Sequence, residues 1–429
     1  MPPRSTSPVK GMRDIIGKQA RLKKWIEKTI QECAYRYAFE PVQFPILEHL
    51  ETLTIKGGGG EEAAKELYLL DDQSGRKLGL RFEHTTSLAR VLAGNPDLPK
   101  PVKTFNMGTV YRYDNPQAMR YREFTQADCD IIGTTHPAAD AECISFAIDV
   151  MKELGFTQFF IRINDRRIIN ELLTLCDIPP AKSKDAMRIL DKLDKIGLEG
   201  VKEELEKQFL STSILAYMES PLSKIKKELT QAKLDLTGVT ALEQLFDTIA
   251  TQKKQSYLKF DPSLMRGLEY YTGTVFEVFA GARVSVGGGG RFDELIQSLG
   301  GLEMPAVGIS FGVDRLMDIL IEKWDEERMN AYILPIGKVY PDAQQLAGKL
   351  REKGLRIELD LMGRSIGKNM NYANTKKFPY VVFLGEDELK QNSVKIRNME
   401  SGEEKMVKTT PLDSLIKELT SHSLPNPKK

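Results

Sequence analysis

The chain has 429 residues, of which 41% are hydrophobic and 28% are charged, as is usual for a globular protein. Its formal net charge of +1 neither implies nor excludes a nucleic-acid partner, because such binding would rest on local basic patches. No apolar stretch approaches the roughly 20 residues of a membrane span, and the first residues lack the apolar core of a secretory signal, so we expect a cytoplasmic protein without a membrane partner.

The cysteines and histidines do not form a metal-binding pattern. The four cysteines lie far apart without a CxxC or Cys/His zinc spacing, so we expect reduced core cysteines and no structural zinc. The four histidines are also scattered, which argues against a histidine-based metal site. These residues are Cys33, Cys129, Cys143, Cys176, His49, His84, His136 and His422.

The first 165 residues alternate between helical and extended patterns. Residues 18–39 are typical of an amphipathic helix, because apolar side chains recur at helical spacing. Residues 57–60 form the first of two runs of four glycines, and without a strand before it or a Lys-Ser or Lys-Thr after it, this run indicates a mobile loop. We further predict an extended stretch at 40–47, a hairpin around 74–75, helices at 84–94 and 137–156, and strands at 102–114, 123–133 and 157–165.

The rest of the chain changes character twice. Residues 166–255 are rich in Lys, Glu and Leu with helical periodicity, which indicates a helical insertion. Beyond it we predict strands at 256–264, 274–280, 283–287 and 306–312, and helices at 291–299 and 313–321. From Ala331 strands and helices alternate, which predicts a small α/β domain with a mainly parallel sheet and a frayed tail at 421–429. The fold class is therefore α+β, an antiparallel body followed by an α/β module.

The second glycine run, Gly287–Gly290 in VSVGGGGRFDELI, raises the question of a phosphate loop. A Walker loop would need Lys and then Ser or Thr after the glycines, and Arg291-Phe292-Asp293 follows instead. A dinucleotide loop would need a parallel unit, whereas the neighbouring strands read as antiparallel. Two interpretations remain equally good: a side-chain-free floor of a pocket, or a glycine-rich bulge.

Polar side chains gather in the segment VYRYDNPQAMRYREFTQADCDI. Alternation places Phe124, Gln126, Asp128 and Asp130 on one face of its second strand. An aromatic ring, an amide and two carboxylates on one face suit the binding of a base, an amine and a basic ring. For the strand taken alone, a solvated polar face is the better explanation.

Three arginines lie at element junctions in glycine-rich or aromatic settings, namely Arg112, Arg266 and Arg315. Each one alone reads as a capping or packing residue. Together, and without a zinc site, a nucleophilic triad or a Walker lysine in the sequence, they indicate phosphoryl-type chemistry that guanidinium groups carry out by positioning and charge.

These segments resemble a known family. VYRYDNPQAMRYREFTQADCDIIG is similar to motif 2 of class II aminoacyl-tRNA synthetases, in a form closer to the archaeal and eukaryotic one, and PAVGISFGVDRLM is similar to motif 3. FEPVQFPIL resembles the weaker motif 1, and RGLEYYTGTVFE and GGGGRFDEL resemble two signatures of histidyl-tRNA synthetases. The resemblance implies a catalytic domain at 1–165 and 257–328, a helical insertion domain at 166–256 and an anticodon-binding α/β domain at 329–429.

The resemblance implies ATP-dependent ligation of L-histidine to tRNA(His) through histidyl-adenylate, with release of AMP and pyrophosphate and with Mg²⁺ carried by ATP. Histidine's own carboxylate would attack, so no catalytic base is needed. Arg112 and Arg266 would be catalytic at the α-phosphate, and Arg266 would also contact the histidine carboxylate. Arg315 would hold the γ-phosphate and stack on adenine opposite Phe124, near Asp114.

The histidine pocket follows from the same resemblance. The matching positions are Glu83, Thr85 and Gln126 for the ammonium group, Asp130 and Tyr271 for the two imidazole nitrogens, and Arg266, Tyr270, Gly288 and Gly289 elsewhere along the pocket. Such polar partners reject apolar amino acids, because a wrong ligand leaves them unpaired. Phe292 replaces a tyrosine common in the family, and His84 departs from the family pattern and is interpreted as structural.

The tRNA contacts and the oligomer are also implied. Gln117, Arg120 and Arg122 would approach the acceptor end, and Arg364, Lys368 and Asn371 would face the anticodon, although a solvated helix explains the last three almost as well. Members of the family are homodimers with motif 1 at the interface. Two other readings are a non-catalytic regulatory paralogue, which would have degraded arginines, and a class II synthetase for glycine, proline or threonine, which would lack RGLEYYTGTVFE.

Overall fold

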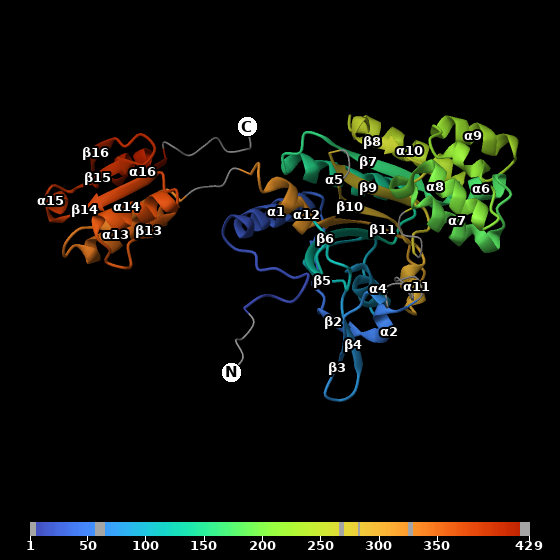
Figure 1. Cartoon of the computed structure of the whole chain (residues 1–429), viewed down its shortest axis with the longest axis horizontal. Coiled ribbons are helices and arrows are strands. Elements are labelled where there is room, and N and C mark those ends of the chain that lie inside the picture. The colour runs from blue at the N-terminus through green and yellow to red at the C-terminus, as the bar shows by residue number, and fades with distance from the viewer. Residues whose placement is uncertain (1–5, 56–64, 266–269, 282–283, 325–328, 421–429) are drawn as a thin grey trace. The chain divides into compact units, whose positions relative to one another are not determined.

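The structure, a computed structural model, describes residues 6–55, 65–265, 270–281, 284–324 and 329–420. The chain divides into two compact units at the boundary between Trp324 and Asp325. The first unit holds a large sheet with many helices, and the second holds a smaller sheet of its own (Figure 1). Within the described ranges, no helix combines the length and the apolar character that crossing a membrane requires.

The first unit is organised around an eight-stranded sheet in the order β1-β5-β6-β11-β10-β9-β7-β8. The strands from β5 to β7 in this order pair antiparallel, whereas β1 and β8 add parallel strands at the two edges. The predicted antiparallel body is therefore confirmed. The bounds are β1 Glu40–Pro41, β5 Val102–Tyr111, β6 Glu123–Ile132, β7 Phe159–Asp165, β8 Leu258–Phe260, β9 Thr274–Ala280, β10 Val284–Arg291 and β11 Ala306–Gly312.

One face of this sheet packs on helices. Ala127, Cys129 and Ile131 of β6 are buried in a core that they share with α1 (Gly17–Arg36) and α5 (Pro137–Glu153). Full burial of an apolar side chain such as Ile131 stabilises the fold by about 1.5–3 kcal/mol, and slipping a strand by one residue would forfeit it. This face therefore fixes the register, and the intervening side chains of β6 must lie on the other face.

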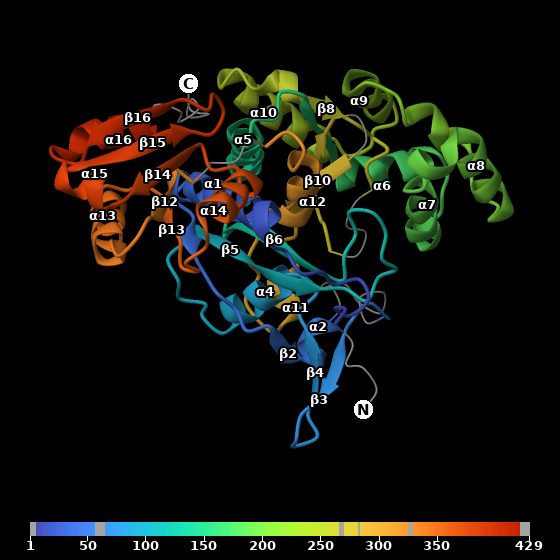
Figure 2. The same cartoon turned by 60° about the vertical axis from the view of Figure 1, so that its left-hand side comes forward.

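The other face is bordered by short helices and a second sheet, in the order β2-β4-β3. Figures 1 and 2 both place α4 and α11 on the opposite side of the large sheet from α1 and α5. The predicted hairpin around 74–75 is confirmed, with the Asp72 carboxylate accepting the N–H groups of Ser74 and Arg76. The bounds are β2 Leu47–His49, α2 Leu50–Leu53, β3 Leu69–Asp71, β4 Lys77–Leu80, α4 Thr85–Ala93 and α11 Leu295–Ser298. The helix α12 (Val313–Leu320) packs instead on α1, in the core on the first face.

All secondary-structure elements that begin within residues 166–255 are helices, as the periodicity predicts, and the strand predicted at 256–264 is shorter, because η3 ends at Tyr257 and β8 covers Leu258–Phe260. The last of the long helices, α10, packs against α5, and its Leu245 and Ile249 join the same core as Ile144 and Ile148. The segment is therefore anchored to the sheet body by buried apolar contacts. The bounds are α6 Arg166–Leu175, η1 Pro180–Lys182, α7 Ser183–Leu190, α8 Leu193–Lys207, η2 Ser213–Tyr217, α9 Leu222–Gln231, α10 Thr237–Thr251 and η3 Gln255–Tyr257.

The second unit has a five-stranded sheet in the order β13-β12-β14-β15-β16. Its first two pairings are parallel and its last two are antiparallel, so the sheet is half parallel rather than mainly parallel. The strands β15 and β16 were not predicted from the sequence, because charged side chains interrupt their apolar residues. The bounds are β12 Ala331–Pro335, α13 Tyr340–Glu352, β13 Ile357–Leu359, α14 Ile366–Thr375, β14 Tyr380–Leu384, α15 Glu386–Lys390, β15 Ser393–Asn398, β16 Glu404–Lys408 and α16 Leu412–Thr420.

Candidate active site

The face of the large sheet that turns away from α1 and α5 carries a row of buried polar side chains. Asp128 and Asp130 of β6 are 4% and 6% exposed, so the interpretation of this face as a solvated one is wrong. The neighbours of β6 across the sheet are Thr104, Asn106, Gly108 and Val110 on β5, and Gly308, Ser310 and Gly312 on β11. Ser310 Oγ accepts a hydrogen bond of 2.7 Å from Gln126 Nε2.

The second glycine run lies inside a strand rather than at a strand-to-helix turn. The strand β10 continues through the glycines to Arg291, with partners on both β9 and β11, and a register shift between Ser285 and Gly287 precedes them. A Cβ at Gly290 would lie 2.7 Å from Thr274 O, and a Cβ at Gly289 would overlap the Gly308 carbonyl. Close backbone approach and a bulge therefore both occur here.

Strand alternation assigns the glycines to different faces. Gly288 and Gly290 lie opposite Ser310 and Gly308, on the polar face of the sheet. Gly289 lies between Ile309 and Phe276, both of which belong to the helix-covered core. Of the two glycines predicted to line the histidine pocket, Gly288 is on the face that carries Asp130, and Gly289 is on the opposite one.

The carboxylate of Asp130 lies on this face beside side-chain-free backbone. A Cβ at Gly308 would overlap Asp130 Oδ1, so the glycine gives this carboxylate its room. Burial, together with the nearby Asp128 and Glu83 carboxylates, raises the pKa of Asp130 well above its ordinary value. A carboxyl with so perturbed a pKa is a candidate functional residue.

Glu83 and His84 enter the site from the start of α4. The Glu83 carboxylate accepts the N–H groups of Thr85 and Thr86, and thereby caps the helix. His84 Nδ1 lies 2.7 Å from Asp128 Oδ2, and its ring is 1% exposed.

Several buried polar atoms around this pair have no hydrogen-bond partner within the described residues. They are His84 Nε2, Thr86 Oγ1, Thr104 Oγ1, Asn106 Nδ2, Gln126 Oε1 and Asp128 Oδ1. Buried polar atoms are rarely left without a partner in native proteins, so their concentration on one face indicates a place for a polar ligand and ordered water.

Two tyrosines border the glycine strand. The rings of Tyr270 and Tyr271 lie 4.4 Å apart, and the Tyr270 hydroxyl lies 3.2 Å from that of Tyr271. The Tyr271 ring covers Gly290, because a Cβ there would lie 3.0 Å from its Cδ1. Phe292 is 3% exposed in the second apolar core and packs edge-on to Tyr270, so its missing hydroxyl is replaced by apolar contact.

The arginines predicted for ATP lie at the other end of this face. The Arg112 guanidinium lies 5.3 Å from the centre of the Phe124 ring and donates from Nε to Phe82 O at 3.0 Å. Arg315, in the first turn of α12, donates to Ser285 O at 2.9 Å and to Met119 O at 3.3 Å. Arg266 lies outside the described residues.

The loop between β5 and β6 holds the residues predicted to meet tRNA. Asp114 forms an ion pair of 3.2 Å with Arg120, and its carbonyl accepts Arg122 Nε at 2.9 Å. Gln117 and Arg120 exchange backbone hydrogen bonds that close the tip. Burial and the nearby Asp114 raise the pKa of the Glu66 carboxyl. Asp114 is thus part of the loop's internal structure.

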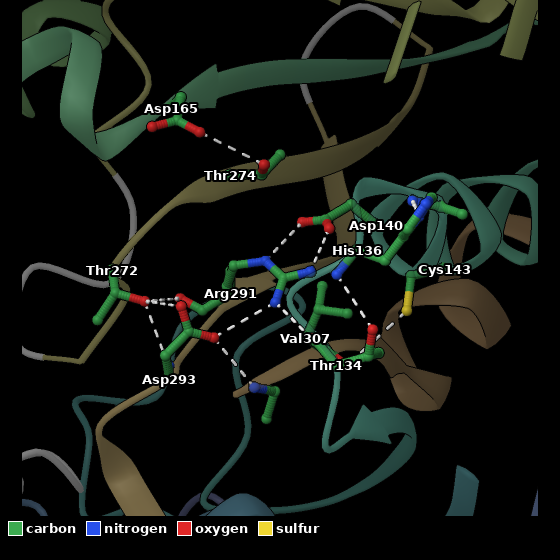
Figure 3. A network of polar contacts seen from close by, with 12 residues as sticks. Thr134, His136, Asp140, Cys143, Asp165, Thr272, Thr274, Arg291, Asp293 and Val307 are labelled. Carbon is green, nitrogen blue, oxygen red and sulfur yellow. Dashed lines mark hydrogen bonds and ion pairs between the residues drawn. The ribbon is translucent and has the colours of Figure 1, made fainter. Parts of the chain in front are cut away.

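A separate polar network anchors the end of the glycine strand (Figure 3). Arg291 pairs with both carboxylate oxygens of Asp140 on α5, donates to Thr134 O at 2.9 Å, and reaches Asp293 at 3.3 Å. A cavity of ≈ 560 Å³ lies beside this network and extends to α10. Within the described residues, none of the predicted site residues lines it.

Some residues of the polar face were not predicted from the sequence. Asn106, Ser310 and Glu277 lie on it, and Ser285 Oγ donates to Glu277 Oε1 at 2.5 Å. Strand alternation in β5 and β11 could have placed Asn106 and Ser310 on the same face as their partner residues in β6. Across the described ranges, no three His, Cys, Asp or Glu side chains are grouped so as to hold a metal ion.

In the second unit, the three residues predicted to face the anticodon lie on or just before α14. Arg364 stacks on Tyr372 at 4.5 Å and lies 3.6 Å from Asp360, whereas Lys368 and Asn371 are exposed.

Two family models match the chain. The histidyl-tRNA synthetase model matches residues 11–316, and the anticodon binding domain model matches residues 330–422. Histidine--tRNA ligase 1 of Bacillus cereus is 36% identical over 421 residues, which are 95% of this chain and 98% of that protein. The histidine--tRNA ligase of Methanococcus maripaludis is 35% identical and covers 93% of this chain and 96% of its own length.

Solved structures agree with the sequence comparisons. The crystal structure of histidyl-tRNA synthetase from Nostoc sp. PCC 7120 superimposes with a TM-score of 0.84 and 25% identity, covering 97% of this chain and 99% of that one. A structure titled as an ATP phosphoribosyltransferase regulatory subunit/histidyl-tRNA synthetase from Bacillus halodurans C has a TM-score of 0.77 at 24% identity, covers 89% of this chain and 99% of that one, and shows the shared fold. The chain belongs to the histidyl-tRNA synthetase family.

Proposed function

We propose that the polar face of β5, β6, β11 and β10 binds L-histidine and ATP side by side, forms histidyl-adenylate, and passes histidine to tRNA(His). The observation that carries this proposal is the pair of buried carboxylates Asp128 and Asp130, which follow the half-buried Gln126 along β6 and lie beside Gly308 and Gly312 of β11. In the first step, a histidine carboxylate oxygen attacks the α-phosphorus of ATP and pyrophosphate leaves. In the second, a hydroxyl of the terminal tRNA ribose attacks the adenylate carbonyl and AMP leaves.

Histidine recognition falls to the inner end of this face. Asp130 accepts one imidazole N–H, and the Tyr271 hydroxyl meets the other ring nitrogen. The burial of Asp130 supports this role, because a hydrogen bond donated by the ligand is stronger in a buried site than in water. Glu83, Thr85 and Gln126 surround the ammonium group, and the unpartnered Gln126 Oε1 is available as an acceptor.

Tyr270, Gly288 and Gly289 complete the pocket in this proposal. Gly288 offers backbone without a side chain on the ligand's face. Gly289 acts indirectly, because its missing Cβ lets β10 approach the Gly308 carbonyl.

ATP occupies the outer end of the face. Phe124 and Arg315 enclose adenine, Arg315 also meets the γ-phosphate, and Arg112 meets the α-phosphate. Arg266 adds positive charge at the α-phosphate and the histidine carboxylate. Because the attacking carboxylate is already ionised, these arginines act by lowering charge repulsion and by placement rather than by moving a proton.

The remaining partners are proposed with the same function. ATP arrives with Mg²⁺ as part of the substrate. Gln117, Arg120 and Arg122 meet the acceptor end, with Asp114 shaping their loop near adenine. The exposed Lys368 and Asn371, with Arg364, meet the anticodon. We further propose a cytoplasmic homodimer.

The test is histidine-dependent exchange of labelled pyrophosphate into ATP, with glycine, proline and threonine as controls. Exchange with histidine alone is expected, followed by charging of tRNA(His). If a folded, ATP-binding protein shows no exchange with histidine, the chain is not a histidine-activating enzyme, and a regulatory role becomes the next hypothesis.

A further inference from the structure

Three segments that are far apart in the sequence meet at one side chain, Arg13. Its Nη1 lies 2.7 Å from the Tyr121 hydroxyl and 2.9 Å from Asp318 Oδ1, and its Nη2 lies 2.9 Å from Asp314 Oδ1. Tyr121 belongs to the loop between β5 and β6, and both aspartates belong to α12. Arg13 therefore ties the N-terminal segment to the loop and to the helix at once.

The geometry of this contact requires a guanidinium group. Arg13 Cζ lies 3.6 Å from the centre of the Tyr121 ring, and the Tyr121 hydroxyl donates in turn to Asp318 Oδ2 at 2.6 Å. Hydrogen bonding closes a ring among Arg13, Tyr121 and Asp318. A lysine could reach one carboxylate, but it could not stack on the ring and divide its donors between two acidic groups.

A second contact from the N-terminal segment fixes the same loop. The Arg122 N–H donates to Gly11 O at 2.8 Å. Gly11 has φ +83°, and a Cβ there would lie 2.8 Å from the Arg122 side chain and 2.9 Å from Pro116 Cγ. Both limbs of the loop therefore rest against the glycine backbone.

The helix that Arg13 contacts also carries Arg315. Asp314 Oδ2 accepts the backbone N–H of Thr125 at 2.7 Å, which ties α12 to the first residues of β6. Arg315, one residue further on, donates to Met119 O in the loop and to Ser285 O on β10. The helix is thus held by its aspartates on one side and by Arg315 on the other.

We propose that Arg13 is a positioning residue that holds the loop of residues 114–122 and the Arg315-bearing helix α12 in one fixed arrangement, so that the ATP contact and the tRNA contacts stay aligned. This inference rests on the proposed function, which gives Arg315 to ATP and the loop to tRNA. Arg13 touches neither substrate in this scheme. It acts through Asp314, Asp318 and Tyr121, and an error of about 1 Å in such a placement can lower a rate about a hundredfold.

The test compares the wild-type protein with R13M, R13K, D318N and K23M. Pyrophosphate exchange reports activation, charging of tRNA(His) adds the transfer step, and hydrogen exchange reports opening of the loop amides without any substrate. K23M is the matched control, because Lys23 also faces Asp314, at 3.6 Å, but from α1. D318N weakens the contacts of residue 318 with Arg13 and Tyr121. It takes the place of R13M in the comparison if R13M does not fold.

We expect R13M to raise KM for ATP and to slow transfer by about tenfold or more, while KM for histidine stays within about twofold. R13K should regain part of the loss and K23M should match the wild type. Amide exchange at Gln117, Arg120 and Arg122 should be faster in R13M than in K23M.

Two results would overturn the positioning role. One is unchanged ATP KM, transfer rate and loop exchange in both R13M and D318N. The other is an equal rise in KM for histidine and ATP, which would mean general loosening of the fold. A wild-type protein without histidine-dependent activity would instead overturn the proposed function, and loop exchange would still decide whether Arg13 holds the loop.

Discussion

His84 Nδ1 lies 2.7 Å from Asp128 Oδ2, and the two side chains are 1% and 5% exposed. An ionised carboxylate only accepts, so His84 Nδ1 is the donor when it pairs with the carboxylate form of Asp128. Asp128 is two residues from Asp130 on the same face of β6, so both buried carboxylates lie on that face. Of the two, Asp128 is the one that pairs with the His84 ring in the described structure. His84, interpreted from the sequence as structural, is a direct neighbour of the candidate histidine pocket.

Replacing His84 by leucine should leave Asp128 buried without its donor. We expect the free energy of unfolding to fall by about 1–3 kcal/mol, the usual cost of an orphaned buried acceptor. Denaturant titration of H84L measures this, with H49Q as the control at an exposed histidine. The double variant H84L/D128L should recover part of the loss, because it removes the orphan. No recovery would mean that the ring acts by packing alone.

Asp130 should cost the unliganded protein stability at neutral pH. Burial and two nearby carboxylates raise its pKa, so the folded state binds this proton more tightly than the unfolded state does. Its contribution is fully present below the ordinary carboxyl pKa and is lost as pH rises through the raised value.

The variant D130N is therefore expected to be more stable than the wild type at pH about 8, by about 1 kcal/mol or more, because the wild-type carboxyl must ionise in a buried site. The two proteins should converge below about pH 3, where the Asp130 carboxyl is protonated in both the folded and the unfolded state. Unfolding curves across this range test the sign, and a less stable D130N at high pH would contradict it. The same variant should lose histidine-dependent exchange, which would mark Asp130 as a functional residue kept at a cost in stability.

The variant G308A should disturb the position of the Asp130 carboxylate by a steric clash. A Cβ at Gly308 overlaps Asp130 Oδ1, so the carboxylate or the strand must shift. We expect KM for histidine to rise by at least about tenfold and stability to fall by about 1–3 kcal/mol, as overpacked sites do. G94A is the control, since its Cβ would meet Val91 O at an ordinary 3.6 Å. Equal histidine KM in both variants would show that this glycine does not shape the pocket.

The sequence predicts which side chains of β6 share a face, but it does not predict that this face is buried. Alternation alone put Gln126, Asp128 and Asp130 on one face, because period two is a local property. That this face is buried depends on β5 and β11, which pair with β6 through contacts that no local pattern reports. The glycine run shows the same limit: its strand character comes from two neighbours rather than from its own propensity.

No pattern in the sequence predicts the contacts of Arg13. It stands in an irregular segment without periodicity, and its partners are 108, 301 and 305 residues away. The family resemblance predicts one pocket for the neighbouring Gly288 and Gly289, whereas adjacent residues of a strand lie on opposite faces of the sheet.

The Arg291–Asp140 pair should be the most costly ion pair to break in the described part of the chain. Their side chains are only 7% and 3% exposed, and burial raises the pKa of Asp140 even against the attraction of Arg291. R291M removes one partner and leaves a buried carboxylate, which typically costs about 3–5 kcal/mol. The double variant R291M/D140L should be markedly more stable than R291M, since no charge remains to be compensated. Denaturant titration of the wild type, the single variants R291M and D140L, and the double variant gives the coupling energy.

A double variant as unstable as R291M would mean that Arg291 stabilises the fold through Thr134 and Asp293. The Arg291–Asp140 pair would then not be the contact that fixes the end of the glycine strand to α5.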